Sequence, residues 1–143
     1  MSTERTAVVR VTHRFSASPE RVFDAWLDPT KAGQWLFATP DGRMVRVEID
    51  ARVGGAFTFV DRRDGEDIEH VGEYLEIERP RRLVFAFAVP KFSAQRTRVT
   101  IEIAPRGSGC ELTLTHEDVL PDWAGRTEAG WTMLLDALAA TLE

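Results

Sequence analysis

The chain has 143 residues, of which 43% are hydrophobic and 29% charged, with a formal net charge of −5. A chain of this length can bury roughly two-thirds of its unfolded surface, which allows one sizeable hydrophobic core. The negative charge argues against a nucleic-acid partner and against an anionic membrane surface, because both attract basic proteins. The single cysteine, Cys110, excludes an intrachain disulfide and a cysteine-based metal cluster.

The start of the sequence, MSTERTAVV, lacks a basic segment followed by an apolar run, so we expect no signal peptide. No apolar run reaches the roughly 18 residues needed to cross a bilayer. These features predict a cytoplasmic protein with no membrane partner. We expect one domain over residues 1–143, as a monomer or a homodimer.

The first elements are a strand and two short helices. Residues 7–15, AVVRVTHRF, alternate apolar with polar side chains and predict a strand. Ser18 is suited to cap a helix that begins at Pro19, where the missing N–H does no harm. The Asp28–Pro29 pair should end this helix and start a second one, because proline disfavours a helical residue before it. We expect the second helix to carry Trp35 and to end near the sequence ATPDG.

Six further strands are predicted between about residue 43 and residue 118, joined by tight turns. Asp64–Gly65 is a strong hairpin signal, and Gly54–Gly55 indicates a turn or a bulge. Each segment has one apolar face, as in an antiparallel sheet with its other face in water. The segments are RMVRVEID, AFTFV, IEHVGEYLEI, RLVFAFAV, TRVTIEI and CELTLTH.

The last segment, residues 126–143, predicts a long helix. Its apolar residues fall at offsets of three, four, seven and eleven, which place them on one helical face: Trp131, Leu134, Leu135, Leu138 and Leu142. Its other side is small, with Gly130, Ala137 and Ala140. The order β-α-α-β-β-β-β-β-β-α predicts an α+β fold. We expect the last helix to lie across the apolar face of a curved, seven-stranded antiparallel sheet.

Several motifs in this order resemble the SRPBCC, or START-like, helix-grip superfamily. More narrowly, the chain is similar to the family named for the C-terminal domain of the heat-shock-protein-ninety ATPase activator. The resemblance extends from about residue 9 to residue 142, with one departure at His13, where we expect arginine in many relatives. The motifs are FSASPERVFDAWLDPTKAGQW, IDARVGGAF, GEYLEIERPRRLVF and GWTMLLDALAATLE.

The resemblance implies a cavity between the sheet and the long helix that holds a small hydrophobic or amphipathic molecule. Large apolar pockets with a few polar groups are the usual small-molecule sites. The alternative is that the inward-facing aromatic side chains fill this space completely. The candidate ligand-binding residues are Trp35, Phe57, Phe59, His70, Tyr74, Phe85, Phe87, His116, Trp131 and Leu135.

Three of these candidates are polar. His70, Tyr74 and His116 could orient a ligand carbonyl or act as acid and base, or they could be hydrogen-bonded residues of the core or its rim. Asp50 and Arg52 stand two apart on one strand face. We expect them to form an ion pair that braces the adjacent turn, with capture of a ligand carboxylate by Arg52 as the alternative.

Recognisable catalytic motifs are missing from the sequence, including nucleotide-binding loops, nucleophile elbows and paired metal-binding histidines. We therefore predict no metal and no cofactor. The favoured function is binding of a small hydrophobic ligand. The second hypothesis is a cyclase- or hydrolase-type enzyme that uses His70, Tyr74 or His116. The third is a chaperone partner in the stress response. It is less favoured because the eukaryotic co-chaperone has a separate N-terminal domain, for which we expect this chain to be too short.

Overall fold

The computed structural model describes residues 6–39, 41–92 and 95–142. The described part contains three α-helices and one short 3-10 helix: α1 Pro19–Leu27, α2 Pro29–Ala32, η1 Pro121–Trp123 and α3 Ala124–Leu142. Its strands are β1 Ala7–Phe15, β2 Arg43–Ile49, β3 Ala56–Arg63, β4 Glu66–Glu78, β5 Arg82–Ala88, β6 Thr97–Arg106 and β7 Gly109–Val119. They form one antiparallel sheet in the order β1-β7-β6-β5-β4-β3-β2. The predicted α+β fold and element order are confirmed.

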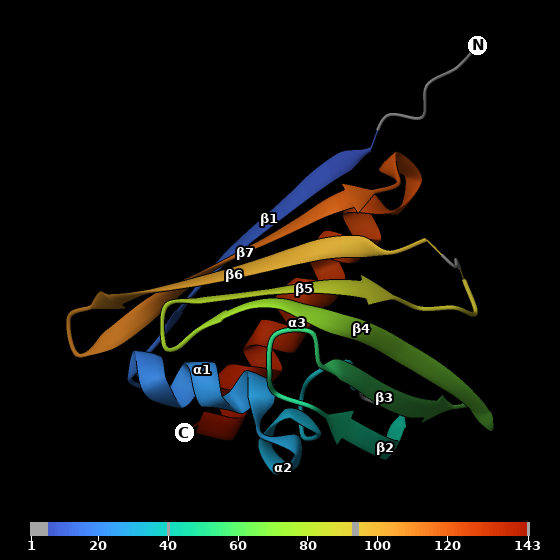
Figure 1. The fold of residues 1–143 in the computed structure, drawn as a ribbon, viewed down its shortest axis with the longest axis horizontal. Coiled ribbons are helices and arrows are strands. Elements are labelled where there is room, and N and C mark those ends of the chain that lie inside the picture. Colours follow the sequence, from blue (N-terminus) through green and yellow to red (C-terminus); the bar gives the residue numbers. More distant parts are fainter. Residues whose placement is uncertain (1–5, 40, 93–94, 143) are drawn as a thin grey trace.

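The long helix α3 lies behind the curved sheet in Figure 1, with α1 and α2 toward its C-terminal end. The Arg21 guanidinium on α1 donates to the Leu142 carbonyl at that end, at 3.0 Å. His13 on β1 bonds to the Asp136 carboxylate of α3, at 3.0 Å, and so links the first strand to the last helix. The first turns of α3 lie at the opposite end of the molecule (Figure 1), beside η1.

Local sequence signals explain where the first helices begin. The Ser18 hydroxyl accepts a hydrogen bond from the Arg21 N–H at 3.2 Å, and Pro19 is the first helical residue, as predicted. Asp28 caps α2 by accepting from the Thr30 N–H at 3.0 Å. The predicted extent of α2 is wrong, because the helix ends at Ala32 and Trp35 lies in the turns that follow.

The early end of α2 has a backbone cause. The N–H groups of Gln34 and Trp35 bond to carbonyls three residues back, as in a turn. Phe37 then adopts a φ of 60°, in the left-handed region that a continuing right-handed helix does not allow. This bend directs the Phe37 ring inward, where it is buried.

The core lies between the sheet and α3, as the apolar patterns predict. Trp131, Leu134, Leu135 and Leu138 are buried, and Leu142 is partly buried, so the predicted stripe of α3 faces the sheet. The strands contribute fully buried side chains that include Phe59, Leu83, Ile101, Leu112 and Leu114. None of the helices in the described residues is both long and apolar enough to cross a membrane.

Turn chemistry agrees with the sequence at two positions. Asp64 and Gly65 have φ of 51° and 77°, which is the left-handed pair expected of a two-residue hairpin turn. Arg52 forms an ion pair with Asp50 at 2.8 Å beside Gly54, so the predicted brace at this turn is confirmed.

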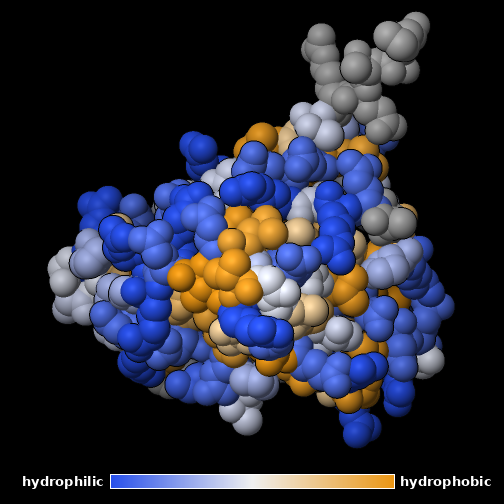
Figure 2. Space-filling model, in the orientation of Figure 1, coloured by the Kyte–Doolittle hydropathy of each residue, from blue (hydrophilic) through white to orange (hydrophobic). Residues whose placement is uncertain are grey.

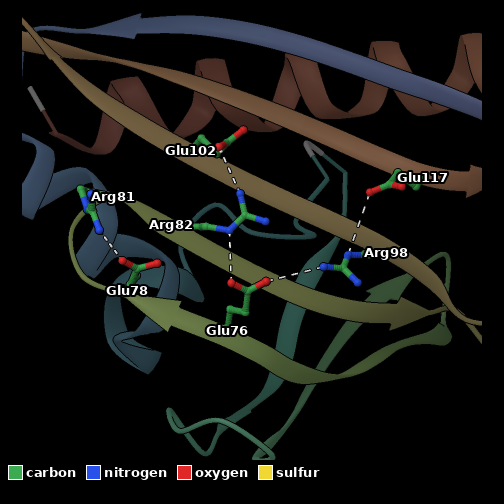
Figure 3. A network of polar contacts seen from close by, with 7 residues as sticks. All are labelled: Glu76, Glu78, Arg81, Arg82, Arg98, Glu102 and Glu117. Carbon is green, nitrogen blue, oxygen red and sulfur yellow. Dashed lines mark hydrogen bonds and ion pairs between the residues drawn. The ribbon is translucent and has the colours of Figure 1, made fainter.

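The outer face of the sheet is covered by charged side chains. Figure 2 shows it as mostly hydrophilic, with smaller apolar areas. In Figure 3, Arg82 lies between Glu76 and Glu102, at 3.3 and 3.1 Å, and Arg98 contacts Glu76 at 3.6 Å. These pairs are partly or fully exposed, so each contributes little to stability, about 0–1 kcal/mol. Their main consequence is that this face is hydrophilic, which leaves the other face for the core.

Candidate functional site at the mouth of the fold

The space between the sheet and the middle of α3 is filled by side chains. A gap of about 10 Å³, which is about the space of one water molecule, lies beside this region, between strands β3 to β5, α1 and residues 36–37. Side chains therefore occupy the interior in this structure, as in the alternative of a filled core. A ligand could enter it only if these side chains moved. The gap is lined by Trp26, Leu36, Phe37, Phe57, Phe59, Tyr74, Leu83 and Phe85.

A glycine on β4 lets the aromatic rings pack so closely. A Cβ atom on Gly72 would lie 2.4 Å from the Phe57 ring and 2.1 Å from the Ala86 carbonyl oxygen. The ring therefore rests directly against the β4 backbone. From there it contacts Phe85 edge-on, with ring centroids 5.4 Å apart, and Tyr74 at 5.3 Å. A larger residue at position 72 would displace this cluster.

Open space lies instead at the end of the fold where β5, the end of β7, η1 and the first turns of α3 meet. Two adjoining pockets there have volumes of about 310 and 300 Å³. Each is at the small end of the range for ligand sites, about 300–1,000 Å³. We call them together the mouth groove, because they share Phe87, Val89, His116, Trp123 and Thr127.

The two parts of the mouth groove differ in their other lining residues. The Arg126 side is also lined by Phe37, Ala38, Thr39, Arg63, His70, Arg126, Gly130, Trp131, Met133 and Leu134. The Phe92 side is also lined by Ala88, Phe92, Gln95, Thr97, Asp118, Val119 and Leu120.

Phe37 separates the mouth groove from the inner gap, because it lines both. Its ring stacks on His70, with centroids 4.7 Å apart, and on Phe87, at 4.9 Å. It also contacts Phe59 edge-on at 5.2 Å. The Phe37 ring therefore lies at the bottom of the groove and separates it from the interior.

His116 is held as a neutral imidazole by its hydrogen bonds. The Trp131 indole N–H donates to Nδ1 at 3.0 Å, so Nδ1 carries no proton. The proton of the neutral ring is then on Nε2, which donates to the Thr97 hydroxyl at 2.6 Å. That hydroxyl donates in turn to the Phe87 carbonyl at 3.1 Å. Burial lowers the pKa of His116 to about 4, which agrees with this neutral form.

His70 is also buried, but it is less well bonded. Its Nδ1 atom has no hydrogen-bonding partner among the described residues. Burial lowers the pKa of His70 to about 4, and the nearby Arg63 charge adds to this shift. Backbone groups of Phe59 and Ile68 oppose the shift but do not reverse it.

An ion pair lies at the edge of the groove. The fully buried Asp61 accepts from the Arg63 guanidinium at 2.8 Å and from the Thr39 hydroxyl at 2.9 Å. Arg63 also donates to the Phe37 carbonyl at 3.4 Å. These bonds hold residues 37–39 against β3, which fixes the position of the Phe37 ring.

The predicted site residues divide into three groups. His70, Phe87, His116 and Trp131 line the mouth groove. Phe57, Phe59, Tyr74 and Phe85 line only the inner gap. Trp35 and Leu135 are fully buried and line neither space. Trp35 donates its indole N–H to the Ala25 carbonyl at 3.1 Å, so it has a structural partner.

Sequence reasoning missed several groove residues, and some of them carry a signal in the sequence. Asp61 and Arg63 continue the inward alternation of Phe57 and Phe59, and a charge at an inward position is unusual. Arg126 lacks such a signal, because its place depends on how η1 meets α3. The other missed residues include Phe37, Phe92, Trp123, Thr127 and Met133.

The described residues contain no cluster of three or more histidine, cysteine, aspartate or glutamate side chains placed to hold a metal ion. Burial raises the pKa of the Tyr74 phenol, which keeps it neutral. The titratable groups predicted for catalysis are thus uncharged at neutral pH in this arrangement.

The sequence and the fold were compared with known proteins. The model of one family, described as Activator of Hsp90 ATPase homolog 1-like protein, matches residues 16–143. A search of curated proteins found no match.

Solved structures with a similar fold cover almost the whole chain. Protein CV1439 from Chromobacterium violaceum is 29% identical, with a TM-score of 0.86, over 94% of this chain and 95% of that one. Protein Mll3558 from Rhizobium loti is 28% identical, with a TM-score of 0.76, over 95% and 96%. The AHSA1-like protein from Aeromonas hydrophila is 23% identical, with a TM-score of 0.81, over 96% of each chain. The predicted helix-grip fold is confirmed.

Proposed function

This chain belongs to the Activator of Hsp90 ATPase homolog 1-like family, and from the site geometry we propose that it binds a small apolar or amphipathic molecule in the mouth groove. The observation that carries the proposal is the groove itself, which is concave and mostly apolar and lies at one end of the fold. Large apolar side chains are exposed around it. They are Phe92, Trp123 and Met133, which are 56%, 41% and 40% exposed. Apolar side chains gathered around a hollow are typical of a binding site.

Binding fits the polar groups of the groove better than catalysis does. An acid or base needs a ring nitrogen free to exchange a proton with a substrate. Both nitrogens of His116 are occupied by Trp131 and Thr97. Tyr74 lines the inner gap rather than the groove. His70 lines the groove and its Nδ1 has no partner among the described residues, but that atom is buried, so a substrate in the groove does not reach it. This geometry favours binding over the enzyme hypothesis, and the chaperone-partner hypothesis rests on the resemblance.

Gly130 offers a direct test, because it lines the groove and no atom lies within 4 Å of where its Cβ would be. Gly130→Leu should place a side chain in the groove, because its Cβ position is open. It should also raise the free energy of unfolding by about 0.5–1 kcal/mol, because glycine is a poor helix former. We expect binding of a fluorescent apolar probe to weaken at least about fivefold, since a ligand and the leucine would compete for the same volume.

The matched control is Gly125→Leu, which makes the same change in the first turn of α3. No atom lies within 4 Å of its Cβ position either, and Gly125 does not line the groove. This variant should bind the probe as the wild type does. Equal probe binding by all three proteins would show that the probe binds elsewhere and would contradict the proposal.

A further inference from the structure

The charges around the mouth groove have one sign on its Arg126 side. This side is lined by Arg63 and Arg126 and by no aspartate or glutamate among the described residues. The chain as a whole has an excess of acidic residues, with a net charge of −5. The positive charge of this lining is therefore opposite in sign to the net charge of the protein.

Of the two arginines, Arg126 has the uncompensated charge. Arg63 pairs with the buried Asp61 at 2.8 Å, so its charge is neutralised within the protein. Arg126 is exposed, and its partner among the described residues is the Trp123 ring, 5.3 Å from the guanidinium carbon. A cation over an aromatic face is held in place but keeps its charge.

The position of Arg126 in α3 strengthens this charge. The N-terminal end of a helix carries a partial positive charge, so acidic residues are favoured in the first turn. The first turn of α3 has no acidic residue and carries Arg126 instead. The charge of Arg126 thus lies beside the partial positive charge of the helix end. The arrangement costs stability in the free protein, and a bound anion would relieve it.

The Phe92 side of the groove has the opposite sign. Asp118 lines it, and no arginine or lysine does among the described residues. The apolar residues Phe87, Val89 and Trp123 lie between the two sides, because they line both. A ligand with a charged head would therefore have one favoured orientation.

We propose that the ligand of the mouth groove is an anionic amphiphile, a monomeric molecule with a hydrocarbon body and a carboxylate or phosphate head. The head lies beside the Arg126 guanidinium, and the body lies on Phe87, Trp131 and Met133. This inference rests on the proposed binding function and specifies its ligand class.

Three amphiphiles with the same chain and different heads test it: dodecanoate, dodecanol and dodecyltrimethylammonium, the two ionic ones below their micelle concentrations and dodecanol below its solubility limit. Affinities are measured by isothermal titration calorimetry with the full chain. Dodecanoate should bind tightest and dodecyltrimethylammonium weakest. Raising the salt concentration should weaken dodecanoate but not dodecanol, because salt screens exposed charges.

Substitution of the arginine gives the decisive comparison. Arg126→Gln should weaken dodecanoate binding about tenfold and leave dodecanol binding unchanged. Arg126→Lys should retain most of the affinity, because the charge remains. Arg10→Gln, on the outer side of β1, makes the same change in net charge away from the groove and should have no effect.

Each other outcome has a definite meaning. Binding of none of the three amphiphiles would overturn the proposed function and this inference with it. Equal binding of all three, or equal losses in Arg126→Gln and Arg10→Gln, would overturn the inference and leave the binding function standing. Binding only to vesicles that contain anionic lipids, and not to soluble dodecanoate, would also overturn it.

Discussion

At the scale of single residues, the two buried histidines show what sequence can and cannot indicate. The alternation of Leu112, Leu114 and His116 placed His116 on the inward face, and it is buried. The sequence could not show that its partners would be Trp131 and Thr97, because these come from α3 and β6. The interpretation of this residue thus depends on tertiary contacts, and they favour a structural role.

The buried histidines predict a pH dependence of stability. Both have a pKa of about 4 in the folded protein, against about 6.5 for an unperturbed histidine. Between these values the unfolded chain binds protons that the folded chain does not. The free energy of unfolding should therefore be constant above about pH 6.5 and fall as the pH drops toward 4, by up to about 3 kcal/mol per histidine.

Urea unfolding at about pH 7 and about pH 5 measures this effect. The variant His116→Gln should lose less stability over the interval than the wild type, because one of the two titrating groups is gone. Carboxylates with a lowered pKa, such as Asp24, lose their contribution only at lower pH. A wild-type stability that does not change between these two pH values would contradict the buried, neutral assignment.

At the scale of elements, the sequence pattern predicted the boundaries of a helix or strand well where the signals lie within that element. The strand over residues 7–15 is found with the same limits, and the cap at Ser18 has the expected bond. The second helix was predicted too long, because it was expected to carry Trp35 and to end near ATPDG, whereas it ends at Ala32. The Trp35 ring is buried by packing on Trp26, edge-on at 4.6 Å, without a helical backbone. Tertiary packing there overrides the local pattern.

The helix α3 has two apolar surfaces with different roles, and they can be separated. Leu135 is fully buried in the core, so Leu135→Ala should lower the free energy of unfolding by about 2–5 kcal/mol and leave probe affinity nearly unchanged. Met133 is 40% exposed on the groove, so Met133→Ala should cost less than about 1 kcal/mol and weaken the probe at least threefold.

Chemical unfolding and probe titration of the two variants together decide this point. Because the changes lie two residues apart on one helix, each variant is the control for the other. A loss of probe affinity in Leu135→Ala that equals the loss in Met133→Ala would mean that the ligand reaches the core, contrary to the filled interior described above.

At the scale of the whole molecule, the fold could be predicted because its signals agree with one another. Strands such as β6 and β7 have one buried apolar face, the turns carry suitable residues, and the last helix has a stripe that matches the sheet. The position of open space could not be predicted in the same way. It depends on whether rings such as Phe57 and Phe37 interlock, and they do so through contacts between distant segments. Open space beside the Phe37 ring lies in the mouth groove.

The most direct test of a ligand site at the mouth is a map of backbone and indole N–H chemical shifts during titration with dodecanoate. We expect shifts at residues that line the groove, such as Val89, Thr127 and Gly130, and at the Trp131 indole N–H. Leu83, beside the inner gap, and Arg82, on the outer face, should change little. Shifts concentrated at Leu83 and the inner gap, shifts confined to the outer face, or no shifts at any concentration below the micelle limit would contradict the account.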